Sequence, residues 1–238
     1  MELEEFCGRF HAFLEQKPET SQIFGAGQKL LGELLSDARW FGKILGKLIS
    51  DPAFLETQIP SVFPNEVTLY RSPDRSFAVL AFIWEPKTPC PIHDHSAWGI
   101  IGSLLHPVKE IRYRRLDDGK AEGYAELEEL SPRVIEPGAT AKVLPLDQGI
   151  HQTGAATAQL AISVGVYGRS IRKGYIHFFN PSEKTVVRAY PPKLHKQVLA
   201  IQTLRANPDL WSEELSVVSR SPSLPASLAK ELSGSREP

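Results

Sequence analysis

Residues 89–99 read PCPIHDHSAWG and contain two histidines, His93 and His95, with one residue between them. In an extended segment, side chains two positions apart project to the same face, so both imidazoles can point to one interior spot while Asp94 points away. Imidazole is the commonest metal ligand, and two ligands from one segment need a third from elsewhere. His151 is the leading candidate, because it follows the turn-forming stretch LDQGI at 146–150.

Short histidine motifs also match by chance, so His93 and His95 could be ordinary turn residues. Their surroundings favour a metal site, because they follow an apolar run at Phe77–Trp84 and a proline-bounded turn, with a third histidine downstream. The other histidines show no such pattern and are interpreted as structural residues: His11, His106, His177 and His195.

Around this segment the chain changes from helical to strand-like periodicity and back. Residues 2–50 carry apolar stripes at helical spacing, and residues 192–232 return to a weaker helical pattern. From about 66 to 190, short β-rich runs alternate with turn residues, which predicts a β-sandwich or small barrel. The expected strands are Glu66–Tyr70, Phe77–Trp84, Trp98–Leu105, Val108–Arg115, Ala121–Leu130, Arg133–Glu136, Thr140–Leu144, Leu160–Tyr167, Tyr175–Phe179 and Lys184–Ala189.

This order of elements predicts one globular unit in three parts. We expect an N-terminal helical cap at 1–60, a β-barrel with the metal site at 61–191, and a C-terminal helical tail at 192–238. The stretch 219–238 is rich in serine and proline, so we expect it to fray at its end.

The composition is that of an ordinary globular protein, with 42% hydrophobic and 23% charged residues in 238. Lys and Arg number 27 and Asp and Glu number 28, which gives a net charge of −1 and argues against nucleic-acid or membrane partners. The acidic start MELEEFCGRF lacks the pattern of an export signal, and two cysteines do not make a disulfide framework. We expect a reduced, cytoplasmic protein, and the oligomeric state stays open.

Three stretches together resemble a known family. Residues 68–102, TLYRSPDRSFAVLAFIWEPKTPCPIHDHSAWGIIG, resemble the iron-binding part of the thiol dioxygenases of the cupin superfamily: cysteine dioxygenase and, more closely, the bacterial 3-mercaptopropionate dioxygenases. LDQGIHQ at 146–152 resembles the second cupin motif, and SVGVYG at 163–168 resembles the strand that bears the active-site tyrosine. The resemblance spans roughly 66–181. It implies an all-β core, the cupin double-stranded β-helix or jelly-roll barrel, with helices on either side.

The resemblance also implies a function. His93, His95 and His151 would be the neutral ligands of Fe(II), and Tyr167 would hydrogen-bond to the bound oxygen species or substrate. The substrate would be a small thiol, expected to be a thiol carboxylate such as 3-mercaptopropionate, cysteine or mercaptosuccinate, which O2 oxidises to the sulfinate. The candidate substrate contacts are Arg71, Arg172, Trp98 and His177.

The sequence departs from the family where the tyrosine is positioned. Gly165 replaces the histidine that orients the tyrosine, so the orientation of Tyr167 must come from elsewhere, with His177 as a candidate. No cysteine follows His95 closely, so no cysteine–tyrosine cross-link is expected, and Cys90 precedes the histidines.

Other interpretations stay open. Glu110, in the alternating stretch VKEIRYRR at 108–115, could be a fourth ligand, a solvent-facing charge or an acceptor behind a ligand. The protein could also be a non-oxidative metal-dependent cupin enzyme, a lyase or isomerase in which the metal is a Lewis acid and Tyr167 a base. A non-catalytic cupin that binds a ligand or metal is the third possibility, and the loss of the relay histidine at Gly165 is its main support.

Overall fold

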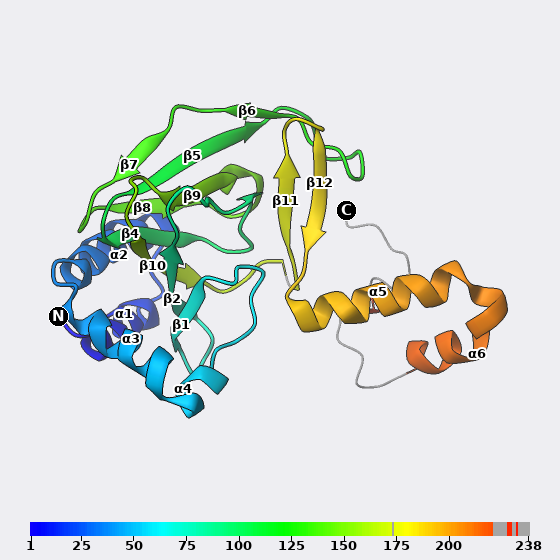
Figure 1. Ribbon diagram of the computed structural model, residues 1–238, viewed down its shortest axis with the longest axis horizontal. Helices are drawn as coiled ribbons and strands as arrows, with labels where there is room; N and C mark the ends of the chain where they lie inside the picture. The colour runs from blue at the N-terminus through cyan, green and yellow to red at the C-terminus, as the bar shows by residue number, and fades with distance from the viewer. Residues whose placement is uncertain (173, 221–227, 230–231, 233–238) are drawn as a thin grey trace.

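The computed structural model describes residues 1–172, 174–220, 228, 229 and 232, and Figure 1 shows its barrel flanked by helices. Within these residues, two antiparallel sheets enclose a common interior. The first sheet has the order β1-β2-β10-β4-β8, with β1 at Glu66–Arg71, β2 at Phe77–Trp84, β10 at Ala161–Gly168, β4 at Gly99–Leu105 and β8 at Thr140–Val143. The second has the order β12-β11-β3-β9-β5-β6, with β12 at Thr185–Ala189, β11 at Ile176–Asn180, β3 at Ile92–His93, β9 at His151–Ala155, β5 at Val108–Arg115, β6 at Leu127–Glu129, and β7 at Arg133–Ile135 paired to β5.

The chain crosses between the two sheets at nearly every step. From β2 to β5, and again from β8 to β11, each strand lies in the sheet opposite to the strand before it. This alternation is the double-stranded β-helix of a jelly roll. The barrel is a cupin fold. The predicted fold class is confirmed, including the helices before and after the barrel.

Helices cover the outer face of the first sheet. They are α1 at Leu3–Glu15, α2 at Thr20–Leu35, α3 at Arg39–Ser50 and the short α4 at Pro52–Glu56. Leu31 and Leu34 of α2 are fully buried in one cluster with Val79 and Val164 of the sheet. Because side chains alternate along a strand, the neighbours of Val79 face the barrel interior, and Leu80 lines a cavity there. Because β2 is covered on both faces, its side chains form a continuous apolar run.

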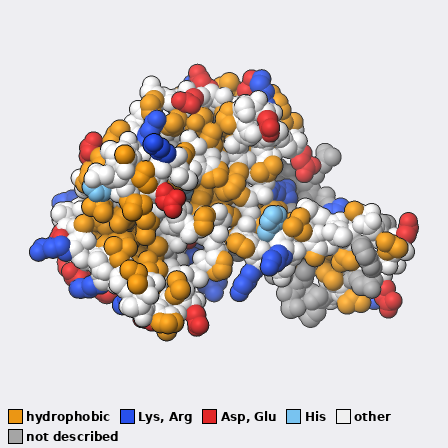
Figure 2. Space-filling model, viewed as in Figure 1, with side chains coloured by type: hydrophobic (Ala, Val, Ile, Leu, Met, Phe, Trp, Pro, Cys, Tyr) orange, Lys and Arg blue, Asp and Glu red, His pale blue; other side chains and the backbone are white. Residues whose placement is uncertain are grey.

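The C-terminal helices form an arm beside the barrel (Figure 1). They are α5 at Pro192–Ala206 and α6 at Pro208–Ser219, and Val198 and Ile201 of α5 are buried against Leu228. Charged side chains of both signs are scattered over the face shown in Figure 2, as the near-neutral composition suggests. No helix among the described residues has the length and apolarity needed to cross a membrane. The predicted fraying beyond residue 219 falls mostly outside the described residues.

The strands differ from the prediction in two places. Of the predicted strand Ala121–Leu130, only Leu127–Glu129 forms a strand, β6. The segment before it is held in a turn, because the carboxylate of Asp117 accepts hydrogen bonds from the backbone N–H groups of Gly119 and Glu126. The second sheet also contains β3 and β9, which were not among the predicted strands. Both are short, and both carry histidines of the predicted metal site.

Candidate metal centre

Three buried imidazoles meet inside the barrel. His93 on β3 and His151 on β9 are directly paired across the two strands, and His95 follows β3 by two residues. Their ring centroids lie 4.6 to 4.8 Å apart, and their nearest candidate ligand atoms all lie within 4.8 Å of one another. The structure thus brings together all three residues that the sequence singled out, in a group that can hold a metal ion.

The donor set fits a metal because each imidazole has one nitrogen already engaged. The Nδ1 atom of His93 lies 2.9 Å from the carbonyl oxygen of Pro91, and Nδ1 of His95 lies 3.3 Å from that of Gly149. Nδ1 of His151 lies 2.7 Å from Oε1 of Glu110. With an acceptor at each Nδ1, the tautomer that satisfies all three rings is Nδ1–H, which leaves the lone pair of every Nε2 for a metal.

The protonation states agree with this role. Burial, together with the neighbouring His151, lowers the pKa of His93 to about 3. Burial, followed by His151 and His93, also holds the pKa of His95 well below its usual value. Both rings are therefore neutral at physiological pH, as metal ligation requires.

Glu110 lies behind His151. Its side chain on β5 is buried, and in addition to His151 it contacts Arg133, with an ion pair between the guanidinium and Oε2. Arg112 Nε lies 3.3 Å from the same oxygen. Burial alone would raise the pKa of Glu110, but the hydrogen bond from His151 and the two arginines lower it to about 2. Of the three predicted roles, the structure supports the acceptor behind a ligand, because Oε1 lies 2.7 Å from Nδ1 of His151.

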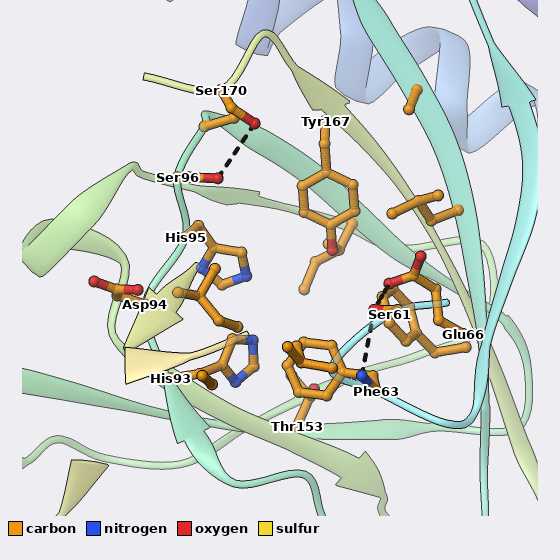
Figure 3. Close-up of a pocket in the computed structure, with 18 of the residues that line it drawn as sticks. Ser61, Phe63, Glu66, His93, Asp94, His95, Ser96, Thr153, Tyr167 and Ser170 are labelled. Atoms are coloured by element: carbon orange, nitrogen blue, oxygen red, sulfur yellow. Dashed lines mark hydrogen bonds between the residues drawn. The ribbon is translucent and has the colours of Figure 1, made fainter. Parts of the chain in front are cut away.

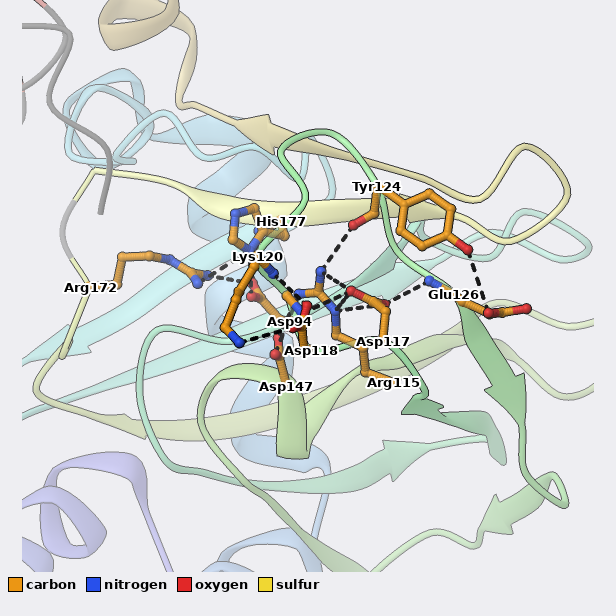
Figure 4. Close-up of polar contacts among 11 residues, drawn as sticks. Asp94, Arg115, Asp117, Asp118, Lys120, Tyr124, Glu126, Asp147, Arg172 and His177 are labelled. Atoms are coloured by element: carbon orange, nitrogen blue, oxygen red, sulfur yellow. Dashed lines mark hydrogen bonds and ion pairs between the residues drawn. The ribbon is translucent and has the colours of Figure 1, made fainter. Parts of the chain in front are cut away.

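Asp94 points away from the cluster of histidines, as the alternation of an extended segment predicts. The fully buried carboxylate accepts from Nη2 of Arg172 at 2.5 Å and lies 3.0 Å from Nδ1 of His177 (Figure 4). The backbone N–H of His177 donates to the same carboxylate at 2.8 Å. These contacts anchor the segment between the two candidate ligands to β11 and to the end of the loop before it.

A cavity of about 480 Å³ opens beside the histidines. Figure 3 shows His93 and His95 along one side of it, Ser61 and Glu66 on the opposite side, and Tyr167 pointing in from the wall. Its lining is largely apolar, with side chains from β2, β4, β5 and the 59–63 segment. This size and character are typical of a site for a small molecule.

Tyr167 is held in place by packing against two glycines. Its ring stacks on His95 with centroids 6.0 Å apart, and it lies over Gly165 and Gly99. A Cβ atom at Gly165 would lie 2.6 Å from Cε2 and 2.9 Å from the hydroxyl oxygen of Tyr167. Among the described residues, the side chain of His177 contacts Asp94 and Arg172, and no hydrogen bond joins it to Tyr167. Gly165 instead makes room for the ring, which lies where a side chain at 165 would lie.

This packing gives a prediction for Gly165→Ala. The added methyl group must displace the Tyr167 ring or strain the strand, so we expect a loss of unfolding free energy of about 1–3 kcal/mol. Chemical denaturation measures it, with Gly8→Ala as the control. Gly8 lies on the exposed side of α1 with open space around its Cβ position, so that variant should be neutral or slightly more stable. Equal stability of the Gly165→Ala protein would contradict the tight packing.

The predicted substrate contacts are distributed differently. Arg71 lines the cavity and has an exposed side chain, and Arg172 lines it while paired to Asp94. Trp98 does not line the cavity, because its indole packs against Phe10 and Phe24 beneath the helical cap. His177 also lies outside the cavity lining, since it is paired to Asp94 behind the histidines. Of the four predicted substrate contacts, Arg71 and Arg172 lie in the cavity lining and Trp98 and His177 lie outside it.

Sequence reasoning missed Glu66, which lines the cavity from the first residue of β1. Its carboxylate accepts a hydrogen bond of 2.6 Å from the hydroxyl of Ser61. The adjacent Val67 packs under the helical cap, so the alternation of the strand directs Glu66 into the barrel.

No known family model matches the sequence. Among solved structures, the chain is similar to a cupin-like protein from Thermotoga maritima, with 15% identity over 50% of this chain and 83% of that one and a TM-score of 0.35. It is also similar to a cupin domain of an XRE family transcriptional regulator from Enterobacter cloacae, with 12% identity, coverage of 45% and 96%, and a TM-score of 0.32. The DMSP lyase DddQ from Ruegeria pomeroyi matches with 17% identity, coverage of 49% and 45%, and a TM-score of 0.29. Likeness at this level concerns the fold alone.

Proposed function

We propose that the protein is an iron-dependent thiol dioxygenase that adds both atoms of O2 to a small thiol and forms its sulfinic acid. The observation that carries the proposal is the set of three buried imidazoles, each with Nδ1 engaged, at the wall of a cavity that Tyr167 also lines. Three neutral ligands on one side leave positions for two reactants on the other. The resemblance of the sequence motifs to thiol dioxygenases supports the choice of reaction.

His93, His95 and His151 would hold ferrous iron, which would supply the redox chemistry needed to react O2 with a thiol. The residues of the chain orient and shield the reactants. Apolar walls that include Leu80 and Phe82 exclude water from the reacting groups. Burial, together with the charge on Glu66, raises the pKa of Tyr167, so its hydroxyl keeps its proton and donates a hydrogen bond to a reactant.

The non-oxidative alternative gives Tyr167 a different role. A lyase or isomerase of this type would need Tyr167 as a base, whereas burial raises its pKa and favours the protonated hydroxyl in the metal-free protein. For a thiol carboxylate, Arg71 is the candidate partner, because the guanidinium of Arg172 is already paired to Asp94.

Oxygen uptake by the anaerobically iron-loaded protein tests the function. The thiols are cysteine, 3-mercaptopropionate, mercaptosuccinate and cysteamine, and sulfinate is quantified in parallel. We expect one sulfinate for each O2 consumed with at least one thiol, and a loss of most of this rate in Tyr167→Phe. Iron-loaded protein that consumes no O2 with any thiol would contradict the proposed function.

A further inference from the structure

The most enclosed unpaired charge in the cavity lining is negative. The three histidines are candidate neutral ligands, and Asp94 and Arg172 cancel each other in a buried ion pair. Glu66 and Arg71 remain. Arg71 has an exposed side chain, whereas Glu66 is half-buried and shares the cavity wall with the candidate metal ligands and Tyr167.

Glu66 has unused capacity to bind a cation. A carboxylate offers about four acceptor positions, and the side-chain hydrogen bond from Ser61 occupies one of them. Among the described residues, no lysine or arginine forms an ion pair with Glu66. Burial raises the pKa of Glu66, with the Ser61 hydrogen bond and the charge of Arg71 opposing that shift. A half-buried carboxylate without an ion-pair partner is costly, and a ligand that brings one reduces this cost.

Aromatic rings lie between Glu66 and the histidines. Phe82 is the partner of Glu66 across β1 and β2, and its ring lies 6.0 Å from that of Phe63. The Phe63 ring in turn lies 4.8 Å from the ring of His93. Both phenylalanines line the cavity, and an ammonium group is attracted to an aromatic face as well as to a carboxylate. Figure 3 shows Phe63 in this position, between His93 and Glu66.

The carboxylate is also held ready by its own segment. The hydroxyl of Ser61 donates to Glu66 and accepts from the backbone N–H of Phe63 at 3.3 Å, so its proton is committed to the carboxylate. The backbone N–H of Glu66 donates to the carbonyl of Phe63 at 3.2 Å, which closes the turn. Carboxylate and aromatic ring are therefore fixed relative to each other before a ligand arrives.

We propose that Glu66, with Phe63 and Phe82, binds the ammonium group of the substrate, so that the protein selects thiols that carry an amino group over those that end in a carboxylate or an uncharged group. The inference rests on the proposed function for the thiol end. An amino thiol takes the place of the thiol carboxylate expected from the sequence. The sequence resemblance assigns no role to Glu66, the residue that would select it.

The test measures binding without turnover. The protein is loaded with redox-inactive Zn(II) and titrated calorimetrically at pH 7 with three thiols of matched length: cysteamine, 2-mercaptoethanol and mercaptoacetate. Because the thiols differ in their own acidity, each one is compared between the wild-type protein and Glu66→Gln. We expect the variant to bind cysteamine about tenfold more weakly or worse, as the loss of a charged hydrogen bond implies, and 2-mercaptoethanol within about twofold. Mercaptoacetate should bind equally well or better.

Two further variants serve as comparisons. Glu122→Gln removes the same charge from an exposed loop and should leave all three affinities unchanged. Arg71→Gln removes the nearby positive charge and should strengthen the binding of cysteamine. An equal loss for all three thiols in Glu66→Gln would mean a structural role and would overturn the inference, as would no change for cysteamine.

The result is separable from the proposed function. If the iron-loaded protein oxidises thiols but Glu66→Gln has no selective effect, only the ammonium site fails. If the Zn(II) protein shows the selective loss of cysteamine but no thiol is oxidised, only the dioxygenase proposal fails.

Discussion

His151→Ala is expected to abolish most metal binding while the barrel remains folded. Loss of a group that only supports a ligand lowers metal affinity by about 10–100-fold. The substitution removes one of the three candidate ligands themselves, so the affinity for Fe(II) should fall by more than this. The fold should persist, because Glu110 keeps its contacts with Arg133 and Arg112. Metal content after anaerobic loading and dialysis measures the first effect, and thermal unfolding of the metal-free protein measures the second.

His195→Ala is the matched control for this experiment. His195 is exposed on α5 and stacks on Tyr190, outside the candidate metal centre. That variant should bind iron as the wild-type protein does. Retention of stoichiometric iron by His151→Ala would show that the ligand set is wrong.

Glu110→Ala is expected to have the second large effect, on stability and on metal affinity together. Removal of a buried carboxylate leaves Arg133 and Arg112 without their partner, and breaking a buried ion pair costs about 3–5 kcal/mol. We expect the lower end of this range, because the side chains of Arg112 and Arg133 are 36% and 40% exposed. Metal affinity should fall by about 10–100-fold, because the tautomer and orientation of His151 are no longer fixed.

The stability part depends on pH in a defined direction. The pKa of Glu110 is about 2 in the folded protein, against an ordinary value of 4.5. Its contribution to the free energy of unfolding is therefore fully present above about pH 4.5 and is lost as the pH falls toward 2. The difference in stability between the wild-type protein and Glu110→Ala should shrink over this interval in urea denaturation.

Glu128→Ala is the control for Glu110. Glu128 lies on β6 and pairs with the exposed Arg114, so its loss should cost less than about 1 kcal/mol. Equal stability of the two variants at neutral pH would contradict the role assigned to Glu110.

The barrel and the three histidines were predictable because they depend on periodicity and spacing. Short apolar runs between turn residues predict a jelly roll, and the His93–His95 spacing places two imidazoles on one face of an extended segment. The pairing of β3 with β9 then brings His151 opposite His93. The sequence could not choose among the roles of Glu110, because alternation in VKEIRYRR does not say which face of the strand is inside.

The side chains around the ligands depend on long-range packing. Trp98 lies in the segment just before β4, where no periodicity predicts the direction of a side chain. Its indole packs against Phe10 and Phe24 of the helical cap and therefore lies outside the cavity. Gly165 was predicted as a lost relay, but its meaning is steric and follows from the position of the Tyr167 ring. Glu66 was missed because its inward direction depends on the helices that cover the other face of its strand.

The acceptors behind the three imidazoles differ in how easily evolution can alter them. His93 and His95 face the main-chain carbonyls of Pro91 and Gly149, which no substitution removes, whereas His151 faces the side chain of Glu110. The acceptors at His93 and His95 are therefore set by the course of the backbone, whereas the acceptor at His151 can be changed by a substitution at position 110. Such a substitution would alter the basicity of this one ligand while the backbone that carries the other two stays in place.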